Sequence, residues 1–292
     1  MTYLMGSYKN GNYKVSIYSD GTKIRENDLD NLTPSFPENI DLKITNYCDA
    51  GCLYCHEDST KQGLHGNLNV DFIETLQPFT ELAIGGGNPL DHPELISFLE
   101  KLKHKNIIAN LTINQIHFQR NQNLVEDIVA RGLTHGLGVS MIKPTDFFIS
   151  QVKKYKNAIV HTINGVTPLS DYEKIGGNQI KILVLGYKHL RRGVDFYSSS
   201  VKKNMEELDS SIERLANLFP VISFDNLALE QLSMKKKISP KYWEEFYMGD
   251  DGKYTMYVDL VKGEFSKSST CMERYPIESN IDSMFKKVLE IK

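Results

Sequence analysis

The sequence predicts an α/β protein: a partial (β/α)6 TIM-like barrel with a short N-terminal β-hairpin region and a C-terminal α+β extension. Short apolar strands alternate with helix-length segments from residue 39 to residue 224, and this alternation favours parallel strands joined by right-handed crossovers. About six or seven such units occupy roughly 190 residues, whereas a complete eight-unit barrel needs about 250. Cysteines, glycines and polar residues follow the ends of several strands, which is where barrel enzymes place their chemistry.

The individual elements of the barrel follow from hydrophobic periodicity. The predicted strands cover residues 40–45, 81–84, 107–113, 136–141, 158–163, 180–185 and 221–224. The predicted helices cover residues 70–79, 93–104, 123–131, 145–155 and 201–218. In the second of these helices, apolar residues recur on one helical face, at Leu95, Phe98 and Leu102.

The two ends of the chain depart from this alternation. Residues 3–25 alternate apolar and polar side chains around two turn dipeptides, Asn10-Gly11 and Asp20-Gly21, and therefore predict short antiparallel strands. After residue 225 the sequence predicts a helix at 241–247, a hairpin across Lys262-Gly263 and a final helix at 279–291. We divide the chain into an N-terminal extension (1–37), a barrel core (38–225) and a C-terminal extension covering the substrate side (226–292).

Composition restricts the classes of function. The chain has 292 residues, 40% hydrophobic and 24% charged, with a formal net charge of −3, which is ordinary for a globular protein. No strong positive field is present to attract nucleic acid. We find neither a secretory signal nor an apolar run long enough to cross a membrane, and we expect a cytoplasmic protein.

Three of the four cysteines, Cys48, Cys52 and Cys55, fall within eight residues directly after the first barrel strand. Disulfides between such close cysteines are strained, and nothing indicates an oxidising compartment. Three thiolates can ligate three irons of a [4Fe–4S] cluster and leave the fourth iron open for a ligand. The alternative is a zinc site, with His56 or Cys271 as the fourth ligand.

The C-x3-C-x2-C spacing after a strand, with the aromatic Tyr54 just before the third cysteine, resembles the radical S-adenosylmethionine superfamily. The resemblance implies that Cys48, Cys52 and Cys55 hold one oxygen-sensitive [4Fe–4S] cluster whose open iron chelates S-adenosylmethionine. It further implies reductive cleavage of that cofactor to methionine and a 5′-deoxyadenosyl radical, which abstracts hydrogen from a substrate. The substrate is a small metabolite, a nucleotide or a peptide, and a flavodoxin or ferredoxin is the expected type of reducing partner.

A glycine run follows the second barrel strand. Its residues Gly86, Gly87, Asn88 and Pro89 resemble the Gly-Gly-Glu-Pro element of the same superfamily, which meets the amino group of S-adenosylmethionine. Asn88 replaces the acid: its amide oxygen accepts a hydrogen bond, but without the strength of a charge-assisted one. The alternative is that the glycines simply form a tight strand-to-helix turn.

Polar residues at later strand ends complete the candidate cofactor site. The resemblance assigns Asn114, Ser140 and Asn164 to cofactor binding, together with Tyr54 and the glycine run; each alone is more often a capped strand end. It assigns no catalytic residue. Since Cys271 is the only further cysteine, a second cluster held wholly by cysteines is excluded. Cys271 is either a packed thiol or a hydrogen-atom donor.

Three hypotheses remain open at this point. The first is an active radical enzyme. The second is a degenerate relative that keeps the cluster and binds S-adenosylmethionine without turnover, for which Asn88 is the motivating residue. The third is a zinc-binding interaction module. A basic group after the sixth strand, Lys188, Arg191 and Arg192, is either an anion site or a solvated loop.

Overall fold

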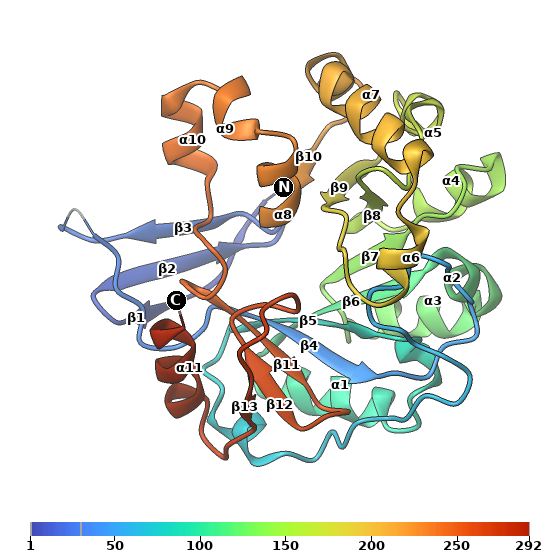
Figure 1. Ribbon diagram of the computed structural model, residues 1–292. Coiled ribbons are helices and arrows are strands. Elements are labelled where there is room, and N and C mark those ends of the chain that lie inside the picture. Colours follow the sequence, from blue (N-terminus) through green and yellow to red (C-terminus); the bar gives the residue numbers. More distant parts are fainter. Residues whose placement is uncertain (1, 30, 292) are drawn as a thin grey trace.

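The computed structural model describes residues 2–29 and 31–291. Its main body is an open ten-stranded sheet with the strand order β10-β9-β8-β7-β6-β5-β4-β11-β12-β13 (Figure 1). The strands of the predicted barrel are β4 (Asn39–Thr45), β5 (Glu81–Gly86), β6 (Ile108–Asn114), β7 (Gly136–Ser140), β8 (Ala158–Ile163), β9 (Lys181–Leu185) and β10 (Ile222–Phe224). All of them pair in parallel with their neighbours. The predicted partial barrel is therefore confirmed.

Helices follow the strands, and all but one of them pack on the outer face of the sheet; the helix at Arg192–Phe196 lies at the strand ends, where Arg192 contacts the Cys52 carbonyl. The helices are α1 (Leu95–His104), α2 (Gln115–Arg120), α3 (Gln122–Ala130), α4 (Asp146–Val152), α5 (Leu169–Ile175), α6 (Arg192–Phe196) and α7 (Ser199–Ala216). The segment predicted as a helix at 70–79 forms only a short 3-10 turn, η1 (Asp71–Thr75). A second 3-10 turn, η2 (Pro89–Asp91), follows the glycine run.

The two faces of the sheet differ in composition. In β8, Ala158, Val160 and Thr162 are buried and alternate with partly accessible residues, as the two-residue period of a strand requires. The buried set packs against the helices and forms the main hydrophobic core. The opposite set faces the concave inside of the sheet, where small side chains such as Ala83 and Gly85 leave space.

The C-terminal segment completes the sheet rather than forming a separate layer. It contains α8 (Asn226–Gln231), α9 (Met234–Lys237), α10 (Pro240–Phe246), β11 (Thr255–Asp259), β12 (Glu264–Ser266), β13 (Tyr275–Pro276) and α11 (Ile281–Glu290). The predicted hairpin is confirmed as β11 and β12. The parallel pairing of β11 with β4 was not predicted; Figure 1 shows these two strands side by side.

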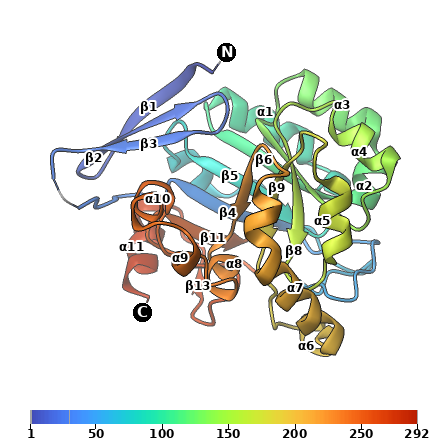
Figure 2. The same ribbon diagram turned by 90° about the horizontal axis from the view of Figure 1, so that it is seen from above.

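The N-terminal segment forms a small antiparallel sheet of β1 (Leu4–Asn10), β2 (Tyr13–Tyr18) and β3 (Lys23–Glu26), which projects to one side of the main body (Figure 2). Glu38, directly before β4, connects the two parts. Its buried carboxylate accepts two hydrogen bonds from Arg25, at 2.8 and 2.9 Å, and one from the Tyr13 hydroxyl at 2.6 Å. The division of the chain at residues 37 and 225 stays a prediction.

Within residues 2–29 and 31–291, the fold includes no helix with both the length and the apolar character needed to span a bilayer.

Candidate functional site

A cavity of about 420 Å³ opens at the carboxyl ends of the parallel strands. Eight of the ten residues predicted for the cluster and the cofactor line it: Cys48, Cys52, Cys55, Tyr54, Gly86, Gly87, Asn114 and Ser140. They come from the loop after β4 and from the ends of β5, β6 and β7. Parallel strands place their carboxyl ends at one edge of a sheet, so residues far apart in the sequence meet there.

The cysteine loop, residues 46–60, has its own backbone hydrogen bonds. The Cys48 N–H donates to the Thr60 carbonyl at 2.8 Å, and the Cys55 N–H donates to the Cys52 carbonyl at 3.3 Å. All three thiols are free and half-buried. The Asn114 amide donates to the Cys52 sulfur at 3.7 Å, so the end of β6 directly contacts a predicted cluster ligand.

The basic group after β9 holds the cysteine loop in place. Arg192 donates to the Cys52 carbonyl at 2.9 Å, and Arg191 donates to the His56 carbonyl at 2.6 Å. Lys188 donates to the Ser269 hydroxyl at 2.9 Å and lies 3.3 Å from the His56 ring nitrogen. The basic group therefore positions the cysteine loop, a role that differs from the two predicted for it, an anion site and a solvated loop.

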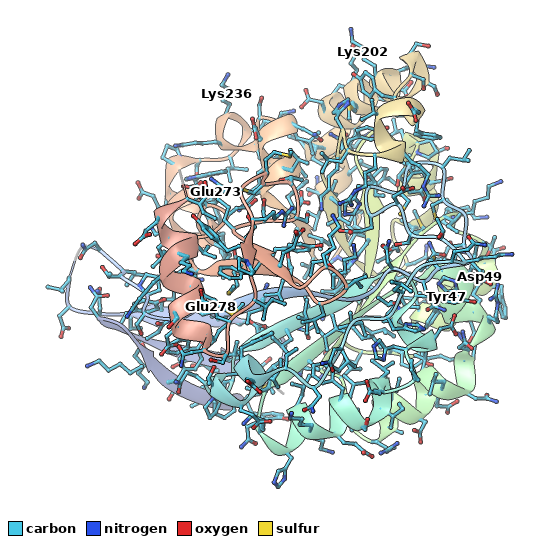
Figure 3. All side chains as sticks on the ribbon, turned by 60° about the horizontal axis from the view of Figure 1, so that its bottom comes forward. Tyr47, Asp49, Lys202, Lys236, Glu273 and Glu278 are labelled. Atoms are coloured by element: carbon cyan, nitrogen blue, oxygen red, sulfur yellow. The ribbon has the colours of Figure 1, made fainter. Side chains whose placement is uncertain are left out.

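Asp49 ties the opposite side of the loop to α2. Its carboxylate lies 2.7 Å from His117 Nε2 and accepts a hydrogen bond from Arg120 at 2.6 Å. These bonds from Arg120 and His117 lower the pKa of Asp49 to about 2. Figure 3 shows Asp49 beside Tyr47 at one side of the molecule. The cysteine loop is therefore anchored on both sides.

A buried ion-pair network supports the loop at its carboxyl end. Lys43, on the inner face of β4, lies 2.6 Å from Glu57 and 3.1 Å from Asp259 of β11. The Tyr257 hydroxyl donates to Glu57 at 3.4 Å. Burial alone would raise the pKa of Glu57, but the hydrogen bond and charge of His56 and the charge of Lys43 hold it well below its ordinary value.

The glycine run packs directly on the cysteine loop. A Cβ atom at Gly87 would lie 2.2 Å from the Tyr47 carbonyl oxygen, and one at Gly86 would lie 2.4 Å from the Thr45 carbonyl oxygen. Gly86 also has a φ of +113°, a conformation that favours glycine. Glycine is therefore needed at positions 86 and 87 because two loops approach closely here, apart from any approach of a ligand.

Asn88 and Asn164 are the two predicted residues that do not line the cavity. The buried Asn88 side chain donates to Asp91 at 2.7 Å and accepts from the Leu90 N–H at 3.3 Å, so it caps η2. The buried Asn164 amide donates to Gln231 at 3.1 Å. Both polar atoms of the Asn88 amide have partners, whereas the buried Oδ1 of Asn164 has none among the described residues. The role of both residues in cofactor binding stays a prediction.

The donor set fits an iron–sulfur cluster. Three free thiols and neutral hydrogen-bond donors such as Asn114 surround one cavity. Throughout the described part of the chain, no group of three or more His, Cys, Asp or Glu side chains is arranged to hold a single metal ion. A [4Fe–4S] cluster requires a different geometry, because each cysteine binds a different iron.

Comparisons with known proteins bear on the fold. No family model matches the sequence, and no curated protein matches it. Crystal structures of SuiB from Streptococcus suis match over 88% of this chain: bound to S-adenosylmethionine (TM-score 0.57, 16% identity) and bound to precursor peptide SuiA (TM-score 0.59, 15% identity). The chain has the fold of SuiB. A third SuiB structure, with a TM-score of 0.54 and 16% identity, agrees.

This shared fold confirms the predicted resemblance at the level of architecture. The matched region covers 65–66% of SuiB, so the chain corresponds to about two thirds of the length of SuiB. One SuiB structure holds S-adenosylmethionine, the cofactor that the cysteine motif implies for this chain.

Sequence reasoning missed the charged inner face of the first barrel strand. Asp41 and Lys43 line the cavity and alternate in the sequence with buried Ile40, Leu42 and Ile44. Charged residues at every second position of an otherwise apolar strand were the available signal. The partner of Lys43 on β11 had no comparable signal, because its pairing with β4 joins distant parts of the sequence.

Proposed function

We propose that this protein is a radical S-adenosylmethionine enzyme with one [4Fe–4S] cluster held by Cys48, Cys52 and Cys55. When bound, the cluster supplies the electron that cleaves S-adenosylmethionine to methionine and a 5′-deoxyadenosyl radical, which abstracts hydrogen from the substrate. The observation that carries this proposal is the single cavity that brings the three cysteines together with the ends of β5, β6 and β7. The fold shared with S-adenosylmethionine-bound SuiB supports it.

The residues of the chain have distinct proposed tasks. Gly86, Gly87 and Ser140 offer backbone and hydroxyl groups to S-adenosylmethionine at the strand ends. Tyr54, whose ring packs against Phe196, closes the same side of the cavity as the cysteine loop. The bonds from Arg191 and Arg192 fix the loop backbone, so the three thiolates are positioned before the cluster binds.

The substrate belongs to one of three classes, a peptide, a small metabolite or a nucleotide. SuiB binds the precursor peptide SuiA, which supports a peptide. A flavodoxin or ferredoxin is the proposed type of electron donor, and the reducing cytoplasm is the compartment that suits an oxygen-sensitive cluster.

The test is an assay for 5′-deoxyadenosine. Protein reconstituted anaerobically with iron and sulfide is reduced in the presence of S-adenosylmethionine, and we expect 5′-deoxyadenosine and methionine in equal amounts. Cys52→Ala should abolish both cluster assembly and product, whereas the matched Cys271→Ser variant should retain both. An intact cluster that yields no 5′-deoxyadenosine would contradict the proposal.

The second candidate is a protein that binds the cluster and S-adenosylmethionine without turnover. Asn88 favours it, because an amide stands where the superfamily has an acid and that amide is hydrogen-bonded to Asp91. Equilibrium binding of S-adenosylmethionine by cluster-loaded protein, combined with the absence of cleavage after reduction, would select this candidate. Zinc instead of iron and sulfide after anaerobic purification would select the zinc-binding module.

A further inference from the structure

We propose that the inside of the sheet binds a substrate that carries a cationic nitrogen, either an amine or a guanidinium, and that Asp41 is the residue that recognises it. This inference rests on the proposed function and names the substrate chemistry of the same cavity. The proposed recognition site lies on the inner face of β4, nearer the amino end of the strand than the proposed cluster and cofactor site.

The strand register gives the depth of Asp41 in the cavity. Asp41 pairs with Ala83 of β5 on one side and with Tyr257 of β11 on the other. It lies four residues before Thr45, the last residue of β4, and at the usual rise per residue that is about 13 Å along the strand. The cysteine loop and Gly86 lie at the far end of this distance, so Asp41 is not among the strand-end groups that face the cofactor.

The charges that face the cavity leave the Asp41 carboxylate without an ion-pair partner among the described residues. Lys43 is already paired with Glu57 and Asp259. The positive charge of Lys188 lowers the pKa of Asp41, but the Lys188 ammonium group forms no ion pair with Asp41 among the described residues and donates instead to Ser269. Among the described residues, the one hydrogen bond to the Asp41 side chain is a long contact of 3.4 Å from Asn39.

A second carboxylate, Asp225, faces the same cavity. One of its oxygens accepts hydrogen bonds from the backbone N–H groups of Gly186 and Ala228, at 2.8 and 2.7 Å. No ion pair to a lysine or arginine is found for Asp225 or Asp41 in residues 2–29 and 31–291. Asp251 adds a third negative charge near both, since it raises the pKa of each. The cavity therefore has an excess of negative charge.

The remaining groups of the inner face do not supply a positive charge. Burial lowers the pKa of His161 to about 4, so its imidazole is neutral at pH 7. Gly138 leaves room for that ring, because a Cβ atom at Gly138 would lie 2.4 Å from it. The Asp41 side chain is exposed in the protein alone, so a ligand can reach it, and a substrate cation would stabilise the ionised carboxylate. The cavity thus combines space, a neutral ring and a carboxylate without an ion-pair partner among the described residues.

The test measures binding of small probes to the cluster-loaded, unreduced protein in the presence of S-adenosylmethionine. The probes are Nα-acetyl-lysine amide and Nα-acetyl-arginine amide, with Nα-acetyl-norleucine amide as the uncharged match, and affinities are measured by saturation-transfer NMR titration. We expect at least one cationic probe to bind at least about tenfold more tightly than the norleucine probe, the usual minimum for a charged hydrogen bond. The lysine and arginine probes separate an amine substrate from a guanidinium substrate.

Two variants assign the effect to Asp41. Asp41→Asn should weaken binding of the preferred cationic probe at least about tenfold, and it should leave the affinity for S-adenosylmethionine and for the norleucine probe unchanged. Asp146→Asn is the matched control, since Asp146 lies on α4 with its side chain 94% exposed, and it should change nothing. Circular dichroism and iron content verify that each variant is folded.

Three results would overturn the inference: equal affinities for charged and uncharged probes, an unchanged affinity for the cationic probe in Asp41→Asn, or a parallel loss of S-adenosylmethionine binding in that variant. The first comparison needs only the wild-type protein, so it stands even where a variant fails to fold. The proposed function is tested separately by 5′-deoxyadenosine formation. If cationic probes bind in an Asp41-dependent way but no 5′-deoxyadenosine forms, only the proposed radical chemistry is rejected. If 5′-deoxyadenosine forms but probe binding does not depend on Asp41, only the proposed cation recognition is rejected.

Discussion

Replacement of Lys43 by methionine tests the buried network behind the cysteine loop. The Lys43 side chain is 3% exposed and forms ion pairs with Glu57 and Asp259, whose carboxylates are also buried. Methionine keeps most of the aliphatic length but removes the charge. Asp259 then has no ion-pair partner among the described residues, and Glu57 keeps only Arg191, at 3.4 Å, and the His56 ring. Loss of one partner of a buried ion pair costs about 3–5 kcal/mol, and we expect a destabilisation of that size.

The assay is urea denaturation followed by circular dichroism, with the free energy of unfolding extrapolated to water. Lys202→Met is the matched control. Lys202 projects from α7 into solvent (Figure 3), with a side chain 67% exposed and 3.9 Å from Glu206, so its loss should cost less than about 0.5 kcal/mol. A cost below about 1 kcal/mol for Lys43→Met would refute the assignment of a buried, stabilising network.

The pH dependence of the wild type gives a second measure of the same network. The folded-state pKa of Glu57 is depressed, so the stability it contributes is present above its ordinary value and is lost as pH falls through the folded pKa. In Lys43→Met one of the charges that depress this pKa is gone, so the loss on acidification should begin at a higher pH. Identical acid profiles for the two proteins would contradict this reasoning.

Three further predictions concern the junction and the loops. Glu38→Gln should lower the free energy of unfolding by about 3 kcal/mol at neutral pH. Hydrogen bonds and charges from its basic partners outweigh burial and lower the pKa of Glu38. The difference in stability between the variant and the wild type should therefore shrink as pH falls below about 4. Gly87→Ala should lower the free energy of unfolding by about 1–3 kcal/mol and reduce iron incorporation, since its Cβ would lie 2.2 Å from the Tyr47 carbonyl oxygen. Gly85→Ala, whose Cβ would lie 3.7 Å from its nearest neighbour, should load iron like the wild type. Equal iron contents in the two variants would contradict the packing argument. Arg192→Ala should release iron several-fold faster to a chelator, because the Cys52 carbonyl loses its 2.9 Å hydrogen bond; an unchanged release rate would show that this bond does not hold the loop.

The barrel could be predicted from sequence because its signals are local. Most strands from β4 to β10 are short apolar runs, each strand is followed by a helix-length segment, and right-handed crossovers restrict how such units pair. The position of β11 was not predictable in this way. Thr255 pairs with Asn39, more than two hundred residues away, and no local pattern specifies which strand edge a late hairpin joins.

The site shows the same division between local and non-local information. The three cysteines and the strand-end residues Asn114 and Ser140 could be placed because the fold brings strand ends together. Asn88 illustrates the limit: its sequence position suggests a ligand, but its side chain caps the turn that follows. Such a choice between a ligand and a cap depends on side-chain orientation, which the spacing of residues does not determine.

The ligands of the cluster are the central claim, and metal analysis of the anaerobically reconstituted protein tests them most directly. We expect about four irons and four sulfides per chain, with both lost in Cys48→Ala, Cys52→Ala and Cys55→Ala and both retained in Cys271→Ser. One zinc per chain with no sulfide, or a full iron and sulfide content in Cys52→Ala, would contradict the assignment.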